Sequence, residues 1–317
     1  MGRFAAIDSP AVDACVADAI REIGGAIDAM RIPRLRGVVL GGGYGRGEGG
    51  VFVDSSGAER LYNDLDFYVV AEAGASGAEL AAINAALAPL SAEWTARLGV
   101  HVDFCPAKTT WRIRHDEERV MIQELVHGYV DVAGEKGAAL FAGVVRRGPE
   151  EFPWDEAARL LMNRGMGLAL ARESGDAGFV ARNVNKCILG AGDAVLIARG
   201  GYRWAASDRA AALGDARYSA AVEWKFRPRA EAPAGWEDAR AAWLAAKEEV
   251  FAAGRRTGAM RRTVRQAARW IARRRTVGDL RTLGLPPSVR IAGKIADAIR
   301  ERRTPSASLV RDWEVFN

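Results

Sequence analysis

The chain has 317 residues, of which 49% are hydrophobic, and it carries a formal net charge of +5. This length and apolar content allow a substantial buried core and predict two domains rather than one. Three widely separated cysteines argue against a disulfide framework and against a cysteine-based zinc site, so a cytoplasmic location is expected. Charged residues interrupt the N-terminal segment, and no later apolar run is long enough for a membrane span, so neither a signal peptide nor a transmembrane segment is predicted.

The N-terminal half alternates helix and strand patterns. Ser9 followed by Pro10 is a helix start, and apolar residues recur from there at helical spacing to about Met30. A β-prone run at residues 37–40 then leads into the glycine-rich segment 41–50, which predicts a strand followed by a tight loop. Further strands are predicted at residues 65–70 and 100–104, separated by an alanine-rich helix at about 78–98.

After Pro153 the patterns become helical. Four segments carry them: residues 157–172, 180–198, 236–253 and 261–275. Chain breakers cluster at Gly148, Pro149 and Pro153, where a connection between domains is expected. The sequence therefore predicts an α/β fold with a small mixed-sheet catalytic domain at residues 1–148, followed by an all-helical domain with a basic C-terminal region at 149–317.

Three carboxylates follow the glycine-rich segment on predicted strands. In a strand, residues i and i+2 face the same side, so Asp64 and Asp66 are expected to project together. If the strand carrying Asp103 pairs beside them, a third carboxylate joins the pair. Such a cluster of like charges is tolerated chiefly with bound cations.

This order of motifs resembles the polymerase-β-type nucleotidyltransferase superfamily, in particular its small-molecule, aminoglycoside nucleotidyltransferase-like members. Residues 42–48 resemble the family's Gly-Ser-x-Ala-Arg-Gly-Glu segment, and the resemblance extends downstream through Glu124 and His127 to Gly134. The chain departs from the family in two places. Gly43 stands where the family has a serine, and residues 54–60 form an insertion, expected to be a hairpin or loop, before the first aspartate.

The resemblance implies Mg²⁺-dependent transfer of a nucleoside monophosphate, AMP from ATP foremost, to a hydroxyl of an unidentified small-molecule or protein acceptor, with release of pyrophosphate. Three residues would be catalytic and would hold two Mg²⁺ ions: Asp64, Asp66 and Asp103. Gly42 and Gly43 would bind the triphosphate through backbone N–H groups, and Arg46 would contact a phosphate. Glu124 or Asp103 would serve as the general base, while a structural role for Glu124 stays open.

Other interpretations of the glycines and the aspartates are weaker. Gly45, Gly47 and Gly50 match the G-x-G-x-x-G pattern of dinucleotide-binding folds, but that pattern requires a helix directly after it. Residues 51–57 are instead β-prone and then turn-like, and no Lys-Ser or Lys-Thr completes a P-loop. An isolated Asp-x-Asp pair is often a solvated surface feature.

The helix expected at residues 180–198 has one polar face, formed by Arg182, Lys186 and Asp193. The residues on the opposite face are apolar and are expected to pack inward: Ile188, Ala191 and Val195. Either Lys186 or Arg182 binds the triphosphate, as basic residues of the helical domain do in similar enzymes, or the polar side is a solvated charged face.

The basic C-terminal region contains an arginine stripe, formed by Arg262, Arg265, Arg269 and Arg273. The stripe is either a solvated face of an outer helix or a binding surface for RNA, an anionic membrane or an acidic partner. Two alternatives to small-molecule transfer follow: a tRNA-directed nucleotidyltransferase, and a non-catalytic, antitoxin-like regulatory module. The sequence leaves the acceptor and the oligomeric state open.

Overall fold

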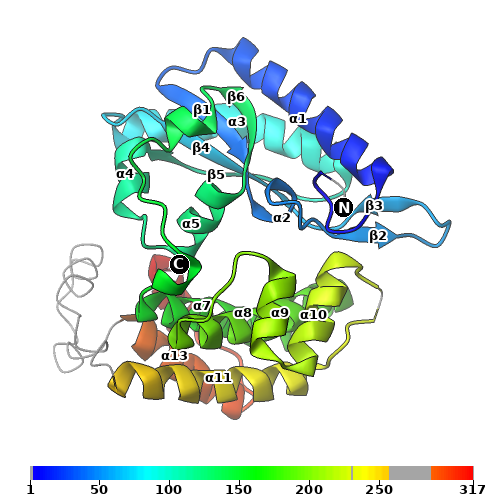
Figure 1. Ribbon diagram of the computed structural model, residues 1–317, viewed down its shortest axis with the longest axis vertical. Coiled ribbons are helices and arrows are strands. Elements are labelled where there is room, and N and C mark those ends of the chain that lie inside the picture. Colours follow the sequence, from blue (N-terminus) through cyan, green and yellow to red (C-terminus); the bar gives the residue numbers. More distant parts are fainter. Residues whose placement is uncertain (1–2, 230, 257–286, 317) are drawn as a thin grey trace. The chain divides into compact units, whose positions relative to one another are not determined.

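The computed structural model describes residues 3–229, 231–256 and 287–316, and it is a mixed α/β structure (Figure 1). The chain divides into two compact units. The first comprises Met1–Arg147 and Lys225–Arg229, and the second comprises Gly148–Trp224 and Ala230–Asn317. That each unit is an independent domain stays a prediction.

The first unit is built on a four-stranded mixed sheet with the strand order β5-β4-β1-β6. The strands are β1 (Leu35–Leu40), β4 (Leu65–Ala71), β5 (Val102–Thr109) and β6 (Val130–Gly134). β4 and β5 run parallel, whereas β1 is antiparallel to both β4 and β6. The strands predicted at 37–40, 65–70 and 100–104 are confirmed as β1, β4 and β5, with small shifts at their ends. β6 was not predicted.

Two long helices cover one face of the sheet, α1 (Pro10–Met30) and α3 (Gly77–Leu98). The hydroxyl of Ser9 caps α1 by accepting from the Val12 N–H, and Ser76 forms a capping box with Glu79 at the start of α3. Alternate residues of β4 join the buried core beneath these helices, beginning with Leu65 and Phe67. Both helices were predicted from their periodicity, and both are confirmed.

Three short helices cover part of the opposite face: α4 (Thr110–His115), α5 (Val120–His127) and α6 (Gly137–Leu140). Val39 and Val70 pack against them in a second apolar cluster. Asp66 and Tyr68 lie on the same face as Val70, because residues two apart along a strand point the same way. One face of β4 is therefore apolar at its end and carries a carboxylate at its start.

The insertion expected at residues 54–60 is a β-hairpin formed by β2 (Val51–Val53) and β3 (Glu59–Leu61). Asp54 closes the turn by accepting hydrogen bonds from the backbone N–H groups of Ser56 and Ala58 at 2.9 and 3.1 Å. The Ser9 hydroxyl donates to Glu59 at 2.6 Å and ties the hairpin to the start of α1. The hairpin, one of the two forms expected for this segment, is confirmed.

Every element in the described part of the second unit is helical. The elements are η1 (Pro149–Glu151), α7 (Trp154–Ala171), α8 (Ala177–Arg199), α9 (Ala206–Leu213), α10 (Ala216–Phe226), α11 (Trp236–Arg256), α13 (Pro287–Arg300) and α14 (Ala307–Phe316). The last two residues of α10 group with the first unit. The helices predicted at 157–172, 180–198 and 236–253 are confirmed as α7, α8 and α11, whereas the helix predicted at 261–275 lies outside the described residues. Within the described ranges, no helix is long and apolar enough to cross a membrane.

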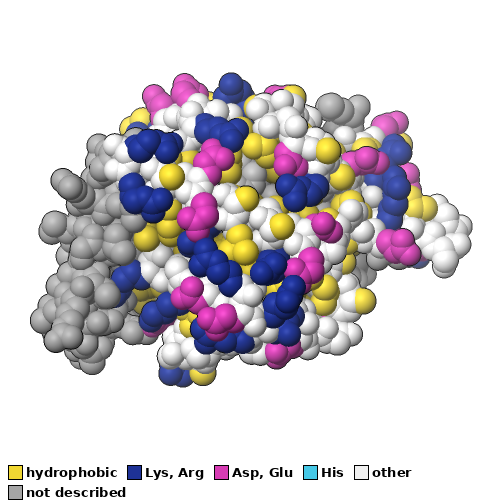
Figure 2. Space-filling model, turned by 90° about the horizontal axis from the view of Figure 1, so that it is seen from below, with side chains coloured by type: hydrophobic (Ala, Val, Ile, Leu, Met, Phe, Trp, Pro, Cys, Tyr) yellow, Lys and Arg dark blue, Asp and Glu magenta, His cyan; other side chains and the backbone are white. Residues whose placement is uncertain are grey.

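Ion pairs link helices of the second unit. Arg199 pairs with Glu249 at 2.7 Å, Arg300 with Glu248 at 3.0 Å, and Arg302 with Glu237 at 2.9 Å. Figure 2 shows acidic and basic side chains interspersed over one face of the molecule. The predicted arginine stripe (Arg262, Arg265, Arg269 and Arg273) lies outside the residues that the structure describes.

Candidate active site

The glycine segment begins where β1 ends. Gly41 continues the β1–β4 ladder, since its N–H donates to the Asp66 carbonyl at 2.9 Å. The chain then forms one helical turn, α2 (Gly42–Gly45), where the sequence predicted only a loop. Gly42 has a φ of +61°, and a Cβ added there would lie 2.1 Å from Oδ2 of Asp66. The Gly42 backbone therefore packs directly against the Asp66 carboxyl group.

Tyr44 holds the segment from within. Its buried hydroxyl donates to the Gly50 carbonyl at 2.7 Å and accepts from the Tyr62 N–H at 3.0 Å. Its ring occupies the space in which a side chain of Gly49 would lie. Burial raises the pKa of Tyr44 to about 12. Sequence reasoning did not assign Tyr44 a role, although a single aromatic residue among glycines is a signal for such an anchor.

Asp66 and Asp103 are directly paired positions on the parallel neighbours β4 and β5. Both carboxyl groups are half-buried. On the other side of the sheet, the rings of Phe67 and Phe104 stack with their centroids 5.1 Å apart. The predicted pairing of the two strands is confirmed. Asp64 lies just before β4 and is exposed.

Negative charge collects at this edge of the sheet. The Cys105 thiol lies 3.8 Å from Oδ2 of Asp103. Burial, followed by the charges of Asp103 and Asp66, raises its pKa to about 12. The pKa of Tyr68 is also raised, chiefly by burial and in addition by the charges of Cys105, Asp66 and Glu124. Burial is thus the main cause of both shifts, and the neighbouring carboxylates add to it.

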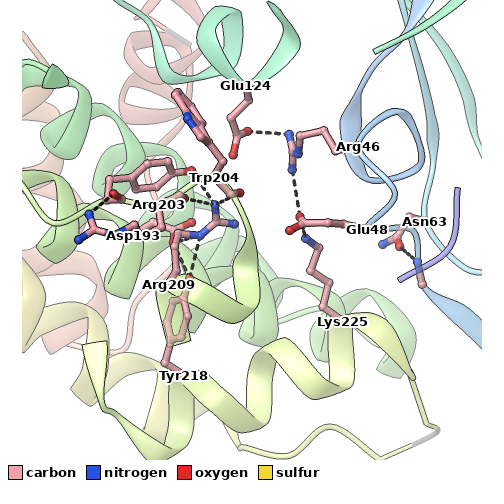
Figure 3. A network of polar contacts seen from close by, with 12 residues as sticks. Arg46, Glu48, Asn63, Glu124, Asp193, Arg203, Trp204, Arg209, Tyr218 and Lys225 are labelled. Atoms are coloured by element: carbon pink, nitrogen blue, oxygen red, sulfur yellow. Dashed lines mark hydrogen bonds and ion pairs between the residues drawn. The ribbon is translucent and has the colours of Figure 1, made fainter. Parts of the chain in front are cut away.

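Arg46 and Glu124 are brought together although they are far apart in the sequence. Nη1 of Arg46 donates to Oε2 of Glu124 at 2.9 Å, and Nη2 lies 3.5 Å from Oε2 of Glu48 (Figure 3). Lys225, which groups with the first unit, donates to the same Glu48 oxygen at 2.8 Å. Arg46 was predicted as a phosphate contact. The structure shows that its guanidinium cross-links the glycine segment and α5.

The three predicted metal ligands have a suitable chemistry, because carboxylate oxygens are the ligands that Mg²⁺ prefers in proteins. Asp66 and Asp103 lie in register, and the Gly42 backbone forms a close wall beside Asp66. Among the described residues, however, no group of three or more His, Cys, Asp and Glu side chains lies close enough to hold a metal ion. The donor set fits Mg²⁺, and the two-ion site stays a prediction.

Lys186 and Arg182 lie on α8 in the second unit, and both are exposed. Their predicted contact with the triphosphate stays a prediction. The apolar residues expected to pack inward, Ile188, Ala191 and Val195, are buried, which confirms that part of the prediction. The expected solvated charged face does not extend to Asp193. Its side chain is 17% exposed and pairs with Nε of the buried Arg209 at 2.9 Å.

Arg209 is the centre of a polar network in the second unit (Figure 3). Its Nη1 donates to the Tyr202 hydroxyl at 3.1 Å and to the carbonyls of Arg203 and Trp204, both at 2.9 Å. Tyr218 donates to Asp193 at 2.5 Å. The network joins α8, α9 and α10, so Asp193 is a structural residue.

No protein-family model matches the chain, and no curated protein matches it. The function is therefore inferred from the residues of the glycine segment and of the paired strands β4 and β5.

Proposed function

We propose that the chain is a Mg²⁺-dependent nucleotidyltransferase that transfers a nucleoside monophosphate, AMP from ATP foremost, to a hydroxyl group and releases pyrophosphate. The observation that carries the proposal is the register of Asp66 and Asp103 beside Gly42. Carboxylates on adjacent strands repel one another, and a protein that only binds an anion gains nothing from placing them next to a glycine segment. A bound cation would offset this repulsion and part of the charge of a triphosphate.

In the proposed reaction the acceptor oxygen forms a bond to the α-phosphorus, and the bond between the α-phosphorus and the bridging oxygen to the β-phosphate breaks. Mg²⁺ held by Asp64, Asp66 and Asp103 would neutralise phosphate charge and lower the pKa of the acceptor hydroxyl. The backbone N–H groups of Gly42 and Gly43 would hold phosphate oxygens at close approach.

The proton of the acceptor hydroxyl would pass to a nearby carboxylate, Glu124 or Asp103. Arg46 supports the first choice, because its guanidinium fixes the Glu124 carboxylate by a hydrogen bond of 2.9 Å. Arg46 would then position Glu124, and its predicted phosphate contact stays a prediction. The triphosphate contact expected of Lys186 stays a prediction from the resemblance.

Transfer can be tested without knowing the acceptor. We would incubate the protein with Mg²⁺, each of the four α-labelled nucleoside triphosphates and fractions of a metabolite extract. The expected result is a new labelled product together with pyrophosphate from the wild type, and none from Asp66→Asn. Asp18→Asn, which changes an exposed carboxylate on α1, is the matched control and should behave as the wild type. Equal product from Asp66→Asn would contradict the proposal.

A further inference from the structure

A pocket of about 700 Å³ lies in the first unit beside the glycine segment. Residues of the N-terminal segment, the end of α2, the end of α5, the start of β6 and the chain around α6 line it. Its volume is within the range of about 300–1,000 Å³ that is typical of small-molecule sites. None of Asp64, Asp66 and Asp103 lines the pocket. It shares Arg46 with the candidate site described above but none of the three aspartates.

The lining is strongly basic. Four of its residues carry a permanent positive charge: Arg3, Arg46, Lys136 and Arg146. Asp131 is the carboxylate in the described lining, and its Oδ1 already accepts from the Gly137 N–H at 2.7 Å, at the start of α6. The Asp131 carboxylate is thus hydrogen-bonded to the backbone, and the four basic side chains outnumber it.

Lys136 and Arg146 differ from Arg46 in their surroundings. Arg46 is held by Glu124 and Glu48, as described above. Lys136 and Arg146 are exposed, and among the described residues neither forms an ion pair with a carboxylate. Lys136, just before α6, and Arg146, after it, thus line one pocket, and neither is paired with a described carboxylate.

Glycine backbone adds to the basic lining. Gly45, Gly47 and Gly128 line the pocket. Gly47 has a φ of +73°, and among the described residues only the Arg3 carbonyl, at 3.5 Å, lies within 4 Å of the position of a Cβ there. A ligand can therefore approach the main chain at Gly47 closely. Tyr129 supplies an aromatic wall and is fixed by an edge contact to Phe141, with ring centroids 5.2 Å apart.

We propose that this pocket binds a phosphate-bearing small molecule, with Lys136 and Arg146 as its principal phosphate contacts. Cations with uncompensated charge, accessible backbone and an apolar wall together suit a phosphorylated organic molecule better than a neutral one. The phosphate belongs either to the nucleoside triphosphate or to a second, phosphorylated molecule. No carboxylate of the proposed catalytic site takes part, so the pocket does not require Mg²⁺.

Calorimetric titration with inorganic pyrophosphate, in EDTA and at low salt, tests the proposal. Charge-assisted hydrogen bonds dominate such a site, so Lys136→Gln/Arg146→Gln should lose at least about tenfold in affinity. Arg21→Gln/Arg31→Gln removes the same charge from exposed positions on and next to α1 and should stay within about twofold of the wild type. Asp66→Asn should also bind normally in EDTA, which separates this proposal from the proposed function.

Absence of pyrophosphate binding by the wild type, or equal affinities in the two double variants, would overturn the proposal. A second titration, with ATP and Mg²⁺ present and compared with Mg²⁺ alone, identifies the source of the phosphate. Loss of pyrophosphate binding assigns the pocket to the triphosphate. Unchanged pyrophosphate binding assigns it to a second phosphorylated molecule.

Discussion

Gly42 and Gly43 look equivalent in the sequence, but the structure constrains them differently. Gly42 has a positive φ, and a Cβ there would meet the Asp66 carboxyl group. A Cβ on Gly43 would lie 3.4 Å from its nearest neighbour, the Glu48 carbonyl oxygen, at the near limit of ordinary contact. A side chain at position 42 would therefore displace the Asp66 carboxyl group, whereas glycine leaves room for it.

We predict that Gly42→Ala lowers the free energy of unfolding by about 1–2 kcal/mol, because an alanine pays the cost of a left-handed conformation. The added methyl group should also displace the Asp66 carboxylate and abolish Mg²⁺-dependent nucleotide binding. Gly43→Ala is the matched control and should retain most of both properties. Urea unfolding and nucleotide titration measure the two effects. Similar losses in the two variants would show that the Gly42–Asp66 contact is not decisive.

Tyr44 allows a prediction for stability against pH. Tyr44→Phe leaves the Gly50 carbonyl and the Tyr62 N–H without their buried partner, so the free energy of unfolding should fall by about 1–3 kcal/mol at pH 8. The pKa of Tyr44 is raised from 10.0 to about 12, so the folded chain keeps a proton that the unfolded chain loses first. Its stabilising contribution is complete below pH 10 and declines as the pH rises towards about 12.

The difference in unfolding free energy between wild type and Tyr44→Phe should therefore narrow by roughly 1 kcal/mol between pH 8 and pH 11. Urea unfolding at a series of pH values measures it. A constant difference would mean that Tyr44 is not buried as described.

Elements with a strong local pattern could be predicted from the sequence, and elements defined by distant partners could not. Ser9 and Pro10 carry both start signals of α1, and the helix begins at Pro10. By contrast, β6 is short, and its place in the sheet is set by pairing with β1, about 90 residues earlier in the chain. Nothing within its five residues reveals that pairing.

The candidate site divides in the same way. The alternation of residues along a strand predicted that Asp64 and Asp66 project together, and the predicted pairing of their strand with that of Asp103 is confirmed. Asp64 lies before the strand, where the two-residue alternation no longer governs the side chain. The contact of Arg46 with Glu124 joins the glycine segment to α5. The two segments share no local sequence pattern, so the sequence indicated both residues but not their pairing.

The network around Arg209 yields a prediction for the packing of α8 with α9 and α10. The Arg209 and Asp193 side chains are 5% and 17% exposed. Arg209→Met strands a half-buried carboxylate, so the free energy of unfolding should fall by about 3 kcal/mol. Asp193→Asn/Arg209→Met should be less destabilised than the sum of the two single variants.

Arg199→Met is the control for this network, since Arg199 and its partner Glu249 are 52% and 40% exposed. Its loss should cost about 1 kcal/mol or less. Chemical unfolding of the four variants measures these differences. A loss for Arg209→Met no larger than that for Arg199→Met would show that the network does not hold the three helices together.

The basic charge of the whole chain leads to a prediction about polyanions. If the arginine stripe at residues 262–273 binds RNA or anionic lipid, changing its four arginines to Gln should weaken that binding and flatten its dependence on salt, because fewer counterions are released. Transfer to a small acceptor should survive the change. Titrations with tRNA and with acidic vesicles at two salt concentrations compare the proteins. Identical curves would leave the stripe as a solvated face.

Thermal unfolding with each nucleoside triphosphate, with Mg²⁺ or with EDTA, tests the proposed metal-dependent site most directly. A ligand present at about 100 times its Kd that binds only the folded state adds about 2.7 kcal/mol to stability. We predict that ATP with Mg²⁺ raises the Tm of the wild type above its value with ATP in EDTA. Asp66→Ala should lose the Mg²⁺-dependent rise and keep or increase its metal-free Tm, because a repelling carboxylate is gone. A wild-type Mg²⁺-dependent rise in Asp66→Ala would contradict the account, as would a wild type that no triphosphate stabilises.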